Sequence, residues 1–135
     1  MSTKVIYWSG TGNTEAMANA IAEGANISAT SVDQASINDI EGAKTIFLGC
    51  SSQGDEILEE DEFLPFLESA QNQFFGKNVV LFGSYDWGNG EWMADWENLM
   101  KDWGANVVEN SVITTLYPEN DVIEALKVLG TKYKA

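Results

Sequence analysis

The sequence contains no histidine and only one cysteine. The absence of histidine removes the commonest general base and the commonest ligand for transition metals. Cys50 has no second cysteine with which to form an internal disulfide, and no histidine to act as its usual catalytic partner. Because Cys50 also ends an apolar run, we interpret it as a buried structural thiol.

Positive charge is scarce as well, since seven Lys and Arg residues face 21 Asp and Glu residues, for a net charge of −14. This balance excludes nucleic acid and anionic membrane surfaces as partners. It is compatible with a basic protein partner that is met by electrostatic steering, or with a charge that only keeps the protein soluble.

Long apolar runs are also missing, because no segment approaches the length of a membrane span and no charged-then-apolar leader is present. We therefore expect a cytoplasmic protein without membrane association. A length of 135 residues predicts a single domain over residues 1–135. A monomer is the simplest expectation for so acidic a domain.

What the chain does have is a run of small polar residues directly after the buried strand-like segment 5–8. The run consists of Ser9, Gly10, Thr11, Gly12, Asn13 and Thr14. Its backbone N–H groups, at the positive end of a helix dipole, would form a concavity that favours a phosphate. No lysine or arginine lies in or beside the run, so neutral donors would hold the phosphate, which suits a permanently docked cofactor.

Three related loops differ from this one. A P-loop ends in Gly-Lys-Ser/Thr, where this chain has Gly12-Asn13-Thr14, so nucleotide hydrolysis is not expected. The dinucleotide fingerprint needs a third glycine where Glu15 stands. A tyrosine phosphatase loop needs a cysteine nucleophile and an arginine, and neither is present in this run. The remaining alternative is a tight strand-to-helix turn with an N-cap threonine and no ligand.

Strand-like and helix-like segments alternate along the chain. The expected strands are Lys4–Trp8, Ile27–Val32, Lys44–Cys50, Asn78–Ser84 and a broken edge strand, Asn106–Val108 with Val112–Thr114. The expected helices are Asn13–Gly24, about Glu62–Phe74, Glu91–Trp103 and Glu119–Lys134. This pattern predicts an α/β fold in which a parallel sheet is covered by helices on both faces.

Two further loops follow strong strands. One is Ser51, Ser52, Gln53, Gly54, Asp55 and Glu56, and the other is Ser84, Tyr85, Asp86, Trp87, Gly88, Asn89 and Gly90. Because the carboxyl ends of parallel strands meet at one edge of the sheet, we expect these loops and the phosphate turn to form a single site.

With these three loops the chain resembles the flavodoxins, in particular the short-chain group. The resemblance spans essentially the whole length and rests on residues 7–15, 48–51, 54–56, 81–85, 87–88, 90 and 92–93. No insertion of about twenty residues interrupts the last strand, as it does in long-chain members. The resemblance implies a three-layer fold with a five-stranded parallel sheet in the order 2-1-3-4-5. It also implies non-covalently bound FMN and low-potential one-electron transfer between redox partner proteins.

The resemblance also assigns roles to the loop residues. Ser9 to Thr14 would hold the FMN phosphate, with Ser51 adding a hydroxyl, and Trp87 would stack on one face of the flavin ring. The Gly54–Asp55 peptide would turn its carbonyl toward the ring nitrogen that gains a proton, and Glu56 would accept the pyrimidine N–H. Backbone N–H groups near Asp86 and Trp87 would hold the ring carbonyl oxygen. The full set of expected cofactor-binding residues is Ser9, Gly10, Thr11, Gly12, Asn13, Thr14, Ser51, Ser52, Gln53, Gly54, Asp55, Glu56, Ser84, Tyr85, Asp86, Trp87 and Gly88.

Two positions depart from the family pattern. Gln53 stands where methionine commonly lies against the inner flavin face, and Asp86 replaces the usual glycine. A cluster of acids at positions 55, 56 and 59–62 is expected beside the flavin edge, where it would lower the second reduction potential. The same acids would also suit a solvated loop before a helix.

Two other functions remain open for this sequence. One is a small FMN-dependent quinone or flavin oxidoreductase, which would need room for a substrate over the ring. The other is a non-catalytic accessory protein with the same fold, dedicated to one enzyme.

Overall fold

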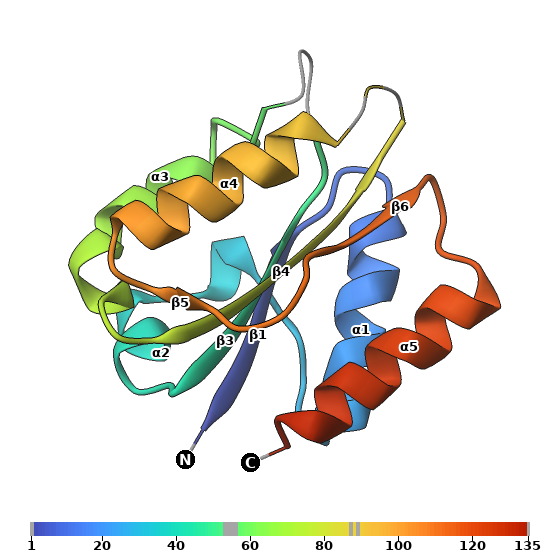
Figure 1. Cartoon of the computed structure of the whole chain (residues 1–135), viewed down its shortest axis with the longest axis horizontal. Helices are drawn as coiled ribbons and strands as arrows, with labels where there is room; N and C mark the ends of the chain where they lie inside the picture. Colours follow the sequence, from blue (N-terminus) through green and yellow to red (C-terminus); the bar gives the residue numbers. More distant parts are fainter. Residues whose placement is uncertain (1, 53–56, 87, 89, 135) are drawn as a thin grey trace.

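A computed structural model of the chain describes residues 2–52, 57–86, 88 and 90–134. Its parallel sheet has the strand order β2-β1-β3-β4-β5, and β6 also pairs with β4 (Figure 1). The strands are β1 (Thr3–Trp8), β2 (Thr30–Ser31), β3 (Thr45–Cys50), β4 (Asn78–Tyr85), β5 (Asn106–Val107) and β6 (Val112–Thr115). The α/β fold and the predicted strand order are therefore confirmed.

The fifth position in the sheet is shared by two short strands. β5 pairs with Asn78 and Val79 at the start of β4, whereas β6 pairs with the end of β4 from Phe82 to Tyr85. Both lie on the side of β4 away from β3. The predicted broken edge strand is thus confirmed as two consecutive pieces along one edge.

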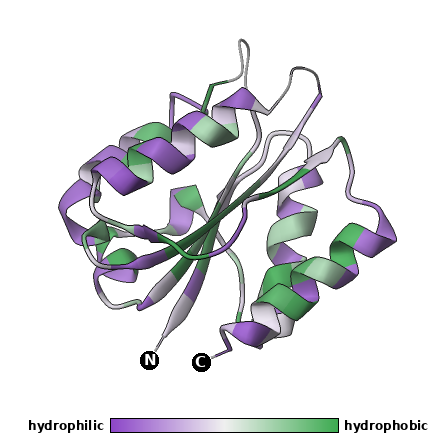
Figure 2. Cartoon of the chain, in the orientation of Figure 1, coloured by the Kyte–Doolittle hydropathy of each residue, from purple (hydrophilic) through white to green (hydrophobic). Residues whose placement is uncertain are grey.

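Helices cover both faces of the sheet. On one face lie α1 (Asn13–Ala25) and α5 (Asn120–Lys132), and on the other lie α2 (Ile37–Glu41), α3 (Phe63–Ser69) and α4 (Glu91–Asp102) (Figure 1). Each face has its own hydrophobic core, and the central strands that separate the two cores carry the hydrophobic colour in Figure 2. All six residues of β3 are buried, as expected for the central strand of a doubly covered sheet.

Side chains of the helices, together with Cys50, complete the two cores. Met17, Ala18, Ala20 and Ile21 of α1 are buried, as is Cys50, whose pKa burial raises to about 12. On α4, Trp92 and Trp96 are buried, whereas Leu99 and Trp103 are only partly buried against the same core. The thiol is therefore structural, since at neutral pH it stays protonated inside the core.

Three segments differ from the sequence prediction. The expected strand Ile27–Val32 shrinks to β2, because Val32 turns into the core and starts the 3₁₀ helix Val32–Gln34. The short helix α2 was not predicted, although its capping box between Ser36 and Asp39 is readable in the sequence. The helix expected over 62–74 splits at Ala70 into α3 and the 3₁₀ helix Gln71–Phe74.

Candidate functional site

The loops after β1, β3 and β4 converge at the carboxyl edge of the sheet. Trp8 and Cys50 are paired neighbours at the ends of β1 and β3, and β4 runs on to Tyr85 beside them. A hollow of about 50 Å³ lies where the loops meet. It is lined by Gly10, Thr11, Ser51, Ser52, Ser84, Tyr85 and Asp86, which are all residues predicted from the sequence.

Three hydroxyl groups tie the loops together beneath this hollow. The Thr14 Oγ1 atom lies 2.8 Å from Ser51 Oγ and 3.0 Å from Ser84 Oγ, and it accepts the Ser84 N–H at 3.2 Å. Thr14, Ser51 and Ser84 are all buried. The Ser52 N–H also donates to the Ser84 carbonyl at 3.1 Å. One connected set of hydrogen bonds therefore fixes the relative positions of all three loops.

The turn that begins α1 has the backbone form expected of an anion site. Gly12 has φ 94°, a left-handed conformation that glycine adopts without cost, and its N–H donates to Ser9 Oγ at 3.0 Å. Asn13 then opens the helix, whose first N–H groups have no partner within the helix. The described residues that line the hollow include no lysine or arginine. The donors available to an anion are thus neutral, as the sequence predicts.

The remaining predicted residues are placed as follows. Asp86 and Gly88 are exposed, and Gly88 has φ 93°. Gln53, Gly54, Asp55, Glu56 and Trp87 lie outside the described residues, so their predicted contacts stay predictions.

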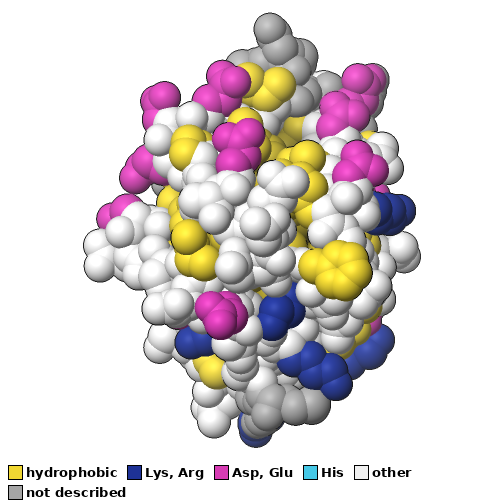
Figure 3. Space-filling model, turned by 90° about the vertical axis from the view of Figure 1, so that its left-hand side faces the viewer, with side chains coloured by type: hydrophobic (Ala, Val, Ile, Leu, Met, Phe, Trp, Pro, Cys, Tyr) yellow, Lys and Arg dark blue, Asp and Glu magenta, His cyan; other side chains and the backbone are white. Residues whose placement is uncertain are grey.

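The acids that follow the 53–56 segment differ in how far their side chains are buried. Glu60, Asp61 and Glu62 are exposed, as is Asp86. In Figure 3 the acidic side chains of the visible face gather mostly toward the upper end, and the lysines lie mostly toward the lower end. The upper end corresponds to the carboxyl edge of the sheet in Figure 1.

Glu59 departs from the alternative of a solvated acidic loop, because its side chain is buried. Its side chain is 7% exposed, and its carboxylate accepts hydrogen bonds from the backbone N–H groups of Asp61, Glu62 and Phe63. The signal that sequence reasoning missed is its spacing. An acid four residues before the first helical residue can accept that residue's unpaired N–H group and the N–H groups of the turn that leads to it.

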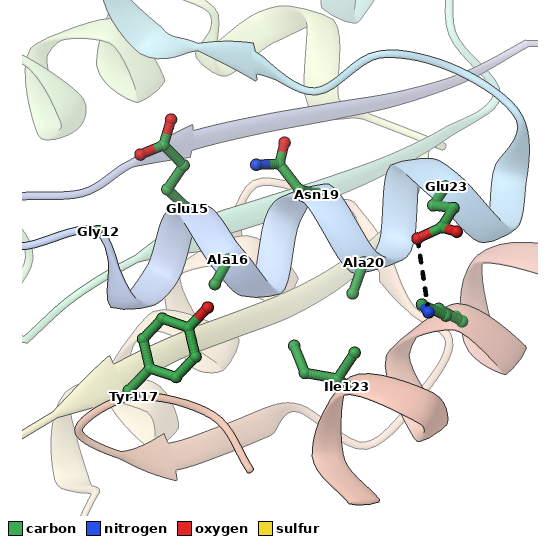
Figure 4. A pocket seen from close by; sticks show the side chains of 9 residues that line it. Gly12, Glu15, Ala16, Asn19, Ala20, Glu23, Tyr117 and Ile123 are labelled. Atoms are coloured by element: carbon green, nitrogen blue, oxygen red, sulfur yellow. Dashed lines mark ion pairs between the residues drawn. The ribbon is translucent and has the colours of Figure 1, made fainter. Parts of the chain in front are cut away.

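A larger hollow of about 410 Å³ lies between α1 and α5 and is lined mostly by residues of these two helices. In Figure 4 Tyr117 and Ile123 face Ala16 and Ala20 across it. The ion pair between Glu23 and Lys127, 3.6 Å apart, lies at one end. Only Gly12 of the predicted site touches this hollow, so it is separate from the place where the three loops meet.

The described part of the chain holds no group of three or more His, Cys, Asp and Glu side chains placed to bind a metal ion. None of its helices is long and apolar enough to cross a membrane.

This sheet order, with a turn that contains no Lys or Arg after β1 and two further loops at the switch point between β1 and β3, defines the flavodoxin-like class of α/β proteins. The flavodoxin family model matches residues 5–129. The chain is 45% identical over 129 residues to a flavodoxin of Clostridium beijerinckii, covering 90% of this chain and 94% of that protein. It is 40% identical over 122 residues to a flavodoxin of Megasphaera elsdenii, covering 87% and 88%.

A solved structure agrees with this match. The solution structure of two-electron reduced Megasphaera elsdenii flavodoxin superposes with a TM-score of 0.84 at 37% identity, covering 97% of this chain and 99% of that one. The protein belongs to the flavodoxin family and is a short-chain member. It is accordingly an FMN-binding electron-transfer protein rather than an enzyme.

Proposed function

We propose that this flavodoxin carries single electrons at low potential by cycling its FMN between the semiquinone and the hydroquinone. The observation that carries the proposal is the convergence of three loops on one cation-free hollow, held together by the buried hydroxyls of Thr14, Ser51 and Ser84. A site fixed in advance lowers the cost of binding a large flat cofactor permanently.

The phosphate of FMN would lie over the turn from Ser9 to Thr14. Exposed Thr11 and half-buried Ser9 and Asn13 have polar side chains near the start of α1, where the helix dipole favours an anion. The flavin ring would extend between the loop that contains Ser52 and the loop that begins at Tyr85 and Asp86. The lining of the hollow, which both loops share, supports this arrangement.

The roles of the residues outside the described ranges belong to the same proposal. Trp87 would stack on the ring, Gln53 would lie against its inner face, and Glu56 would accept the pyrimidine N–H. The Gly54–Asp55 peptide would accept a hydrogen bond from the reduced ring, which stabilises the semiquinone. Glycine suits this position because it adopts both backbone conformations at little steric cost.

Docking would be electrostatic. Glu60, Asp61, Glu62 and Asp86 are exposed acids. Glu62 accepts a hydrogen bond from Trp8 at the end of β1, and Asp86 lines the hollow, so these acids lie near the carboxyl edge of the sheet. A redox partner with a basic surface would be steered to this edge, giving fast, weak and salt-sensitive encounters. We further propose that the carrier works as a monomer in the cytoplasm, and sedimentation of the purified protein would test the monomer.

The test is a stepwise reduction of the purified FMN-loaded protein, followed by its absorption spectrum. The proposal expects a semiquinone that accumulates to more than half of the flavin before the hydroquinone forms. Reduction that passes directly to the hydroquinone would show that the Gly54–Asp55 peptide does not stabilise the semiquinone as proposed. Rapid turnover of a quinone with NAD(P)H and no partner protein would favour an oxidoreductase instead. Refusal of added FMN would favour an accessory protein.

A further inference from the structure

Glu59 is a buried carboxylate that accepts hydrogen bonds from the backbone that leads into α3. Its Oε2 atom accepts the N–H of Asp61 at 2.7 Å, and its Oε1 atom accepts the N–H groups of Glu62 at 2.8 Å and Phe63 at 2.7 Å. Its own carbonyl accepts the Leu64 N–H at 3.0 Å. One residue thus pairs with four successive N–H groups.

Burial makes this arrangement stronger than an ordinary helix cap. Asp39 accepts the Ser36 N–H at the start of α2 from a half-buried position. Glu59 is 7% exposed, and desolvating a carboxylate is unfavourable unless charged hydrogen bonds compensate. Phe63 next to it is fully buried and packs edge-on against Trp96, with the ring centroids 5.4 Å apart. The chain after Glu59 is therefore held firmly against the core.

The position of Glu59 gives this anchor a function. It lies three residues after the 53–56 segment, which by the proposed function contains the contacts to the flavin ring. On the other side of that segment, Ser51 belongs to the hydroxyl network and the Ser52 N–H donates to the Ser84 carbonyl. The described residues on both sides of 53–56 are thus fixed, by hydroxyls before it and by the Glu59 carboxylate after it.

We propose that Glu59 is a positioning residue that sets the separation between the two reduction potentials of bound FMN. It acts through the backbone it holds and not by touching the cofactor. This inference rests on the proposed one-electron function, in which the Gly54–Asp55 peptide changes its backbone conformation on reduction. The free energy of that change depends on where the two ends of segment 53–56 are fixed. Loosening one end makes the conformation selected by one-electron reduction less favourable.

The experiment compares Glu59→Gln with two matched variants by spectroelectrochemistry of the FMN-loaded proteins. Glu59→Gln removes the charge and one acceptor oxygen, Glu60→Gln removes an exposed charge one residue away, and Asp39→Asn weakens a remote cap. We expect Glu59→Gln to lower the semiquinone formation constant at least tenfold, which narrows the separation of the two potentials by about 59 mV. Glu60→Gln is expected to raise the second potential slightly, and Asp39→Asn to leave both potentials unchanged.

Two further measurements separate positioning from folding. Urea denaturation and FMN affinity are measured on every variant, and Glu59→Asp, which keeps the charge, is the second variant at this site. A potential separation in Glu59→Gln equal to that of the wild type, or changed only as in Glu60→Gln, would overturn the inference. So would loss of FMN binding in both Glu59 variants together with a large fall in their stability to urea, since Glu59 would then serve folding alone. Failure of the proposed function is seen separately, as a wild-type protein that accumulates no semiquinone.

Discussion

Hydroxyl groups at the carboxyl edge of the sheet are either buried or exposed, and the two kinds have different roles. Thr14 is 0% exposed and its hydroxyl is shared with Ser51 and Ser84, whereas Thr11 is exposed and lines the hollow. The buried hydroxyl joins the loops to one another. The exposed one is available to a ligand.

Replacing Thr14 with valine keeps the shape of the side chain but removes this shared hydroxyl. The Ser84 N–H then loses the Thr14 hydroxyl as its acceptor, so we expect the apoprotein to lose about 1–3 kcal/mol of unfolding free energy, measured by urea denaturation. Thr11→Val is the matched control, expected to keep the stability but to weaken FMN binding. Equal stability of the two variants would contradict the role assigned to the hydroxyl network.

A second residue-scale feature lies far from the site, where Tyr133 and Lys132 both donate to Glu109 Oε2, at 2.5 and 2.6 Å. Burial, together with the hydrogen bond to Glu109, raises the pKa of Tyr133 from 10.0 to about 12. The hydrogen bond from Lys132, followed by that from Tyr133, lowers the pKa of Glu109 below 4.5. The cluster of Glu109, Lys132 and Tyr133 therefore stabilises the fold in the pH range between the pKa of Glu109 and the pKa of Tyr133.

The sign of each shift fixes the pH dependence. A raised tyrosine pKa contributes stability that is present below pH 10 and lost as the pH rises toward about 12. The lowered Glu109 pKa contributes stability that is present above pH 4.5 and lost in acid. We expect Tyr133→Phe to flatten the alkaline fall of the unfolding free energy, and exposed Tyr117→Phe to leave it unchanged. An alkaline fall that is identical in wild type and Tyr133→Phe would contradict this account.

At the scale of elements, α1 and α5 pack closely because two glycines allow it. A Cβ atom at Gly24 would lie 2.0 Å from the Lys127 carbonyl oxygen, and one at Gly130 would lie 2.1 Å from the Ile21 carbonyl oxygen. Both obstacles are backbone atoms, so a larger residue can be accommodated only if the helices separate.

We therefore expect Gly24→Ala and Gly130→Ala each to lower the unfolding free energy by about 1–3 kcal/mol, despite alanine's better helix propensity. Gly42→Ala is the control, because its Cβ would meet the Asn38 carbonyl oxygen at an ordinary 3.4 Å. Denaturant titration of the three variants checks this. A stabilised Gly24→Ala or Gly130→Ala protein would show that the helices are not held this closely.

The elements also show what could be predicted from the sequence. Apolar runs that end in polar loops predicted the positions of β1, β3 and β4. Because parallel strands end at the same edge of the sheet, these runs also predicted where the three loops meet. The β2 strand was too long in the prediction because local pattern does not show that Val32 turns into the core. The burial of Glu59 was missed because an acidic run favours a solvated loop, and only the three-dimensional structure shows which acid accepts backbone N–H groups.

Across the whole molecule, charge is distributed unevenly. Acids predominate around the carboxyl edge of the sheet on the face shown in Figure 3, while lysines lie mostly toward the opposite end. The net charge is −14, and the described lining of the hollow has no cation. An anionic phosphate would thus approach a molecule whose long-range field repels it, and only short-range neutral donors would hold it.

The most direct test of this account is the affinity of the apoprotein for FMN, measured by flavin fluorescence quenching at several salt concentrations. Salt screens the long-range repulsion but barely weakens short hydrogen bonds from neutral donors. The account predicts an affinity that stays level or rises between about 10 mM and 0.5 M salt, where the Debye length falls from about 30 Å to below 8 Å. An affinity that falls steeply with salt would show that a cation holds the phosphate, and would contradict the site described above.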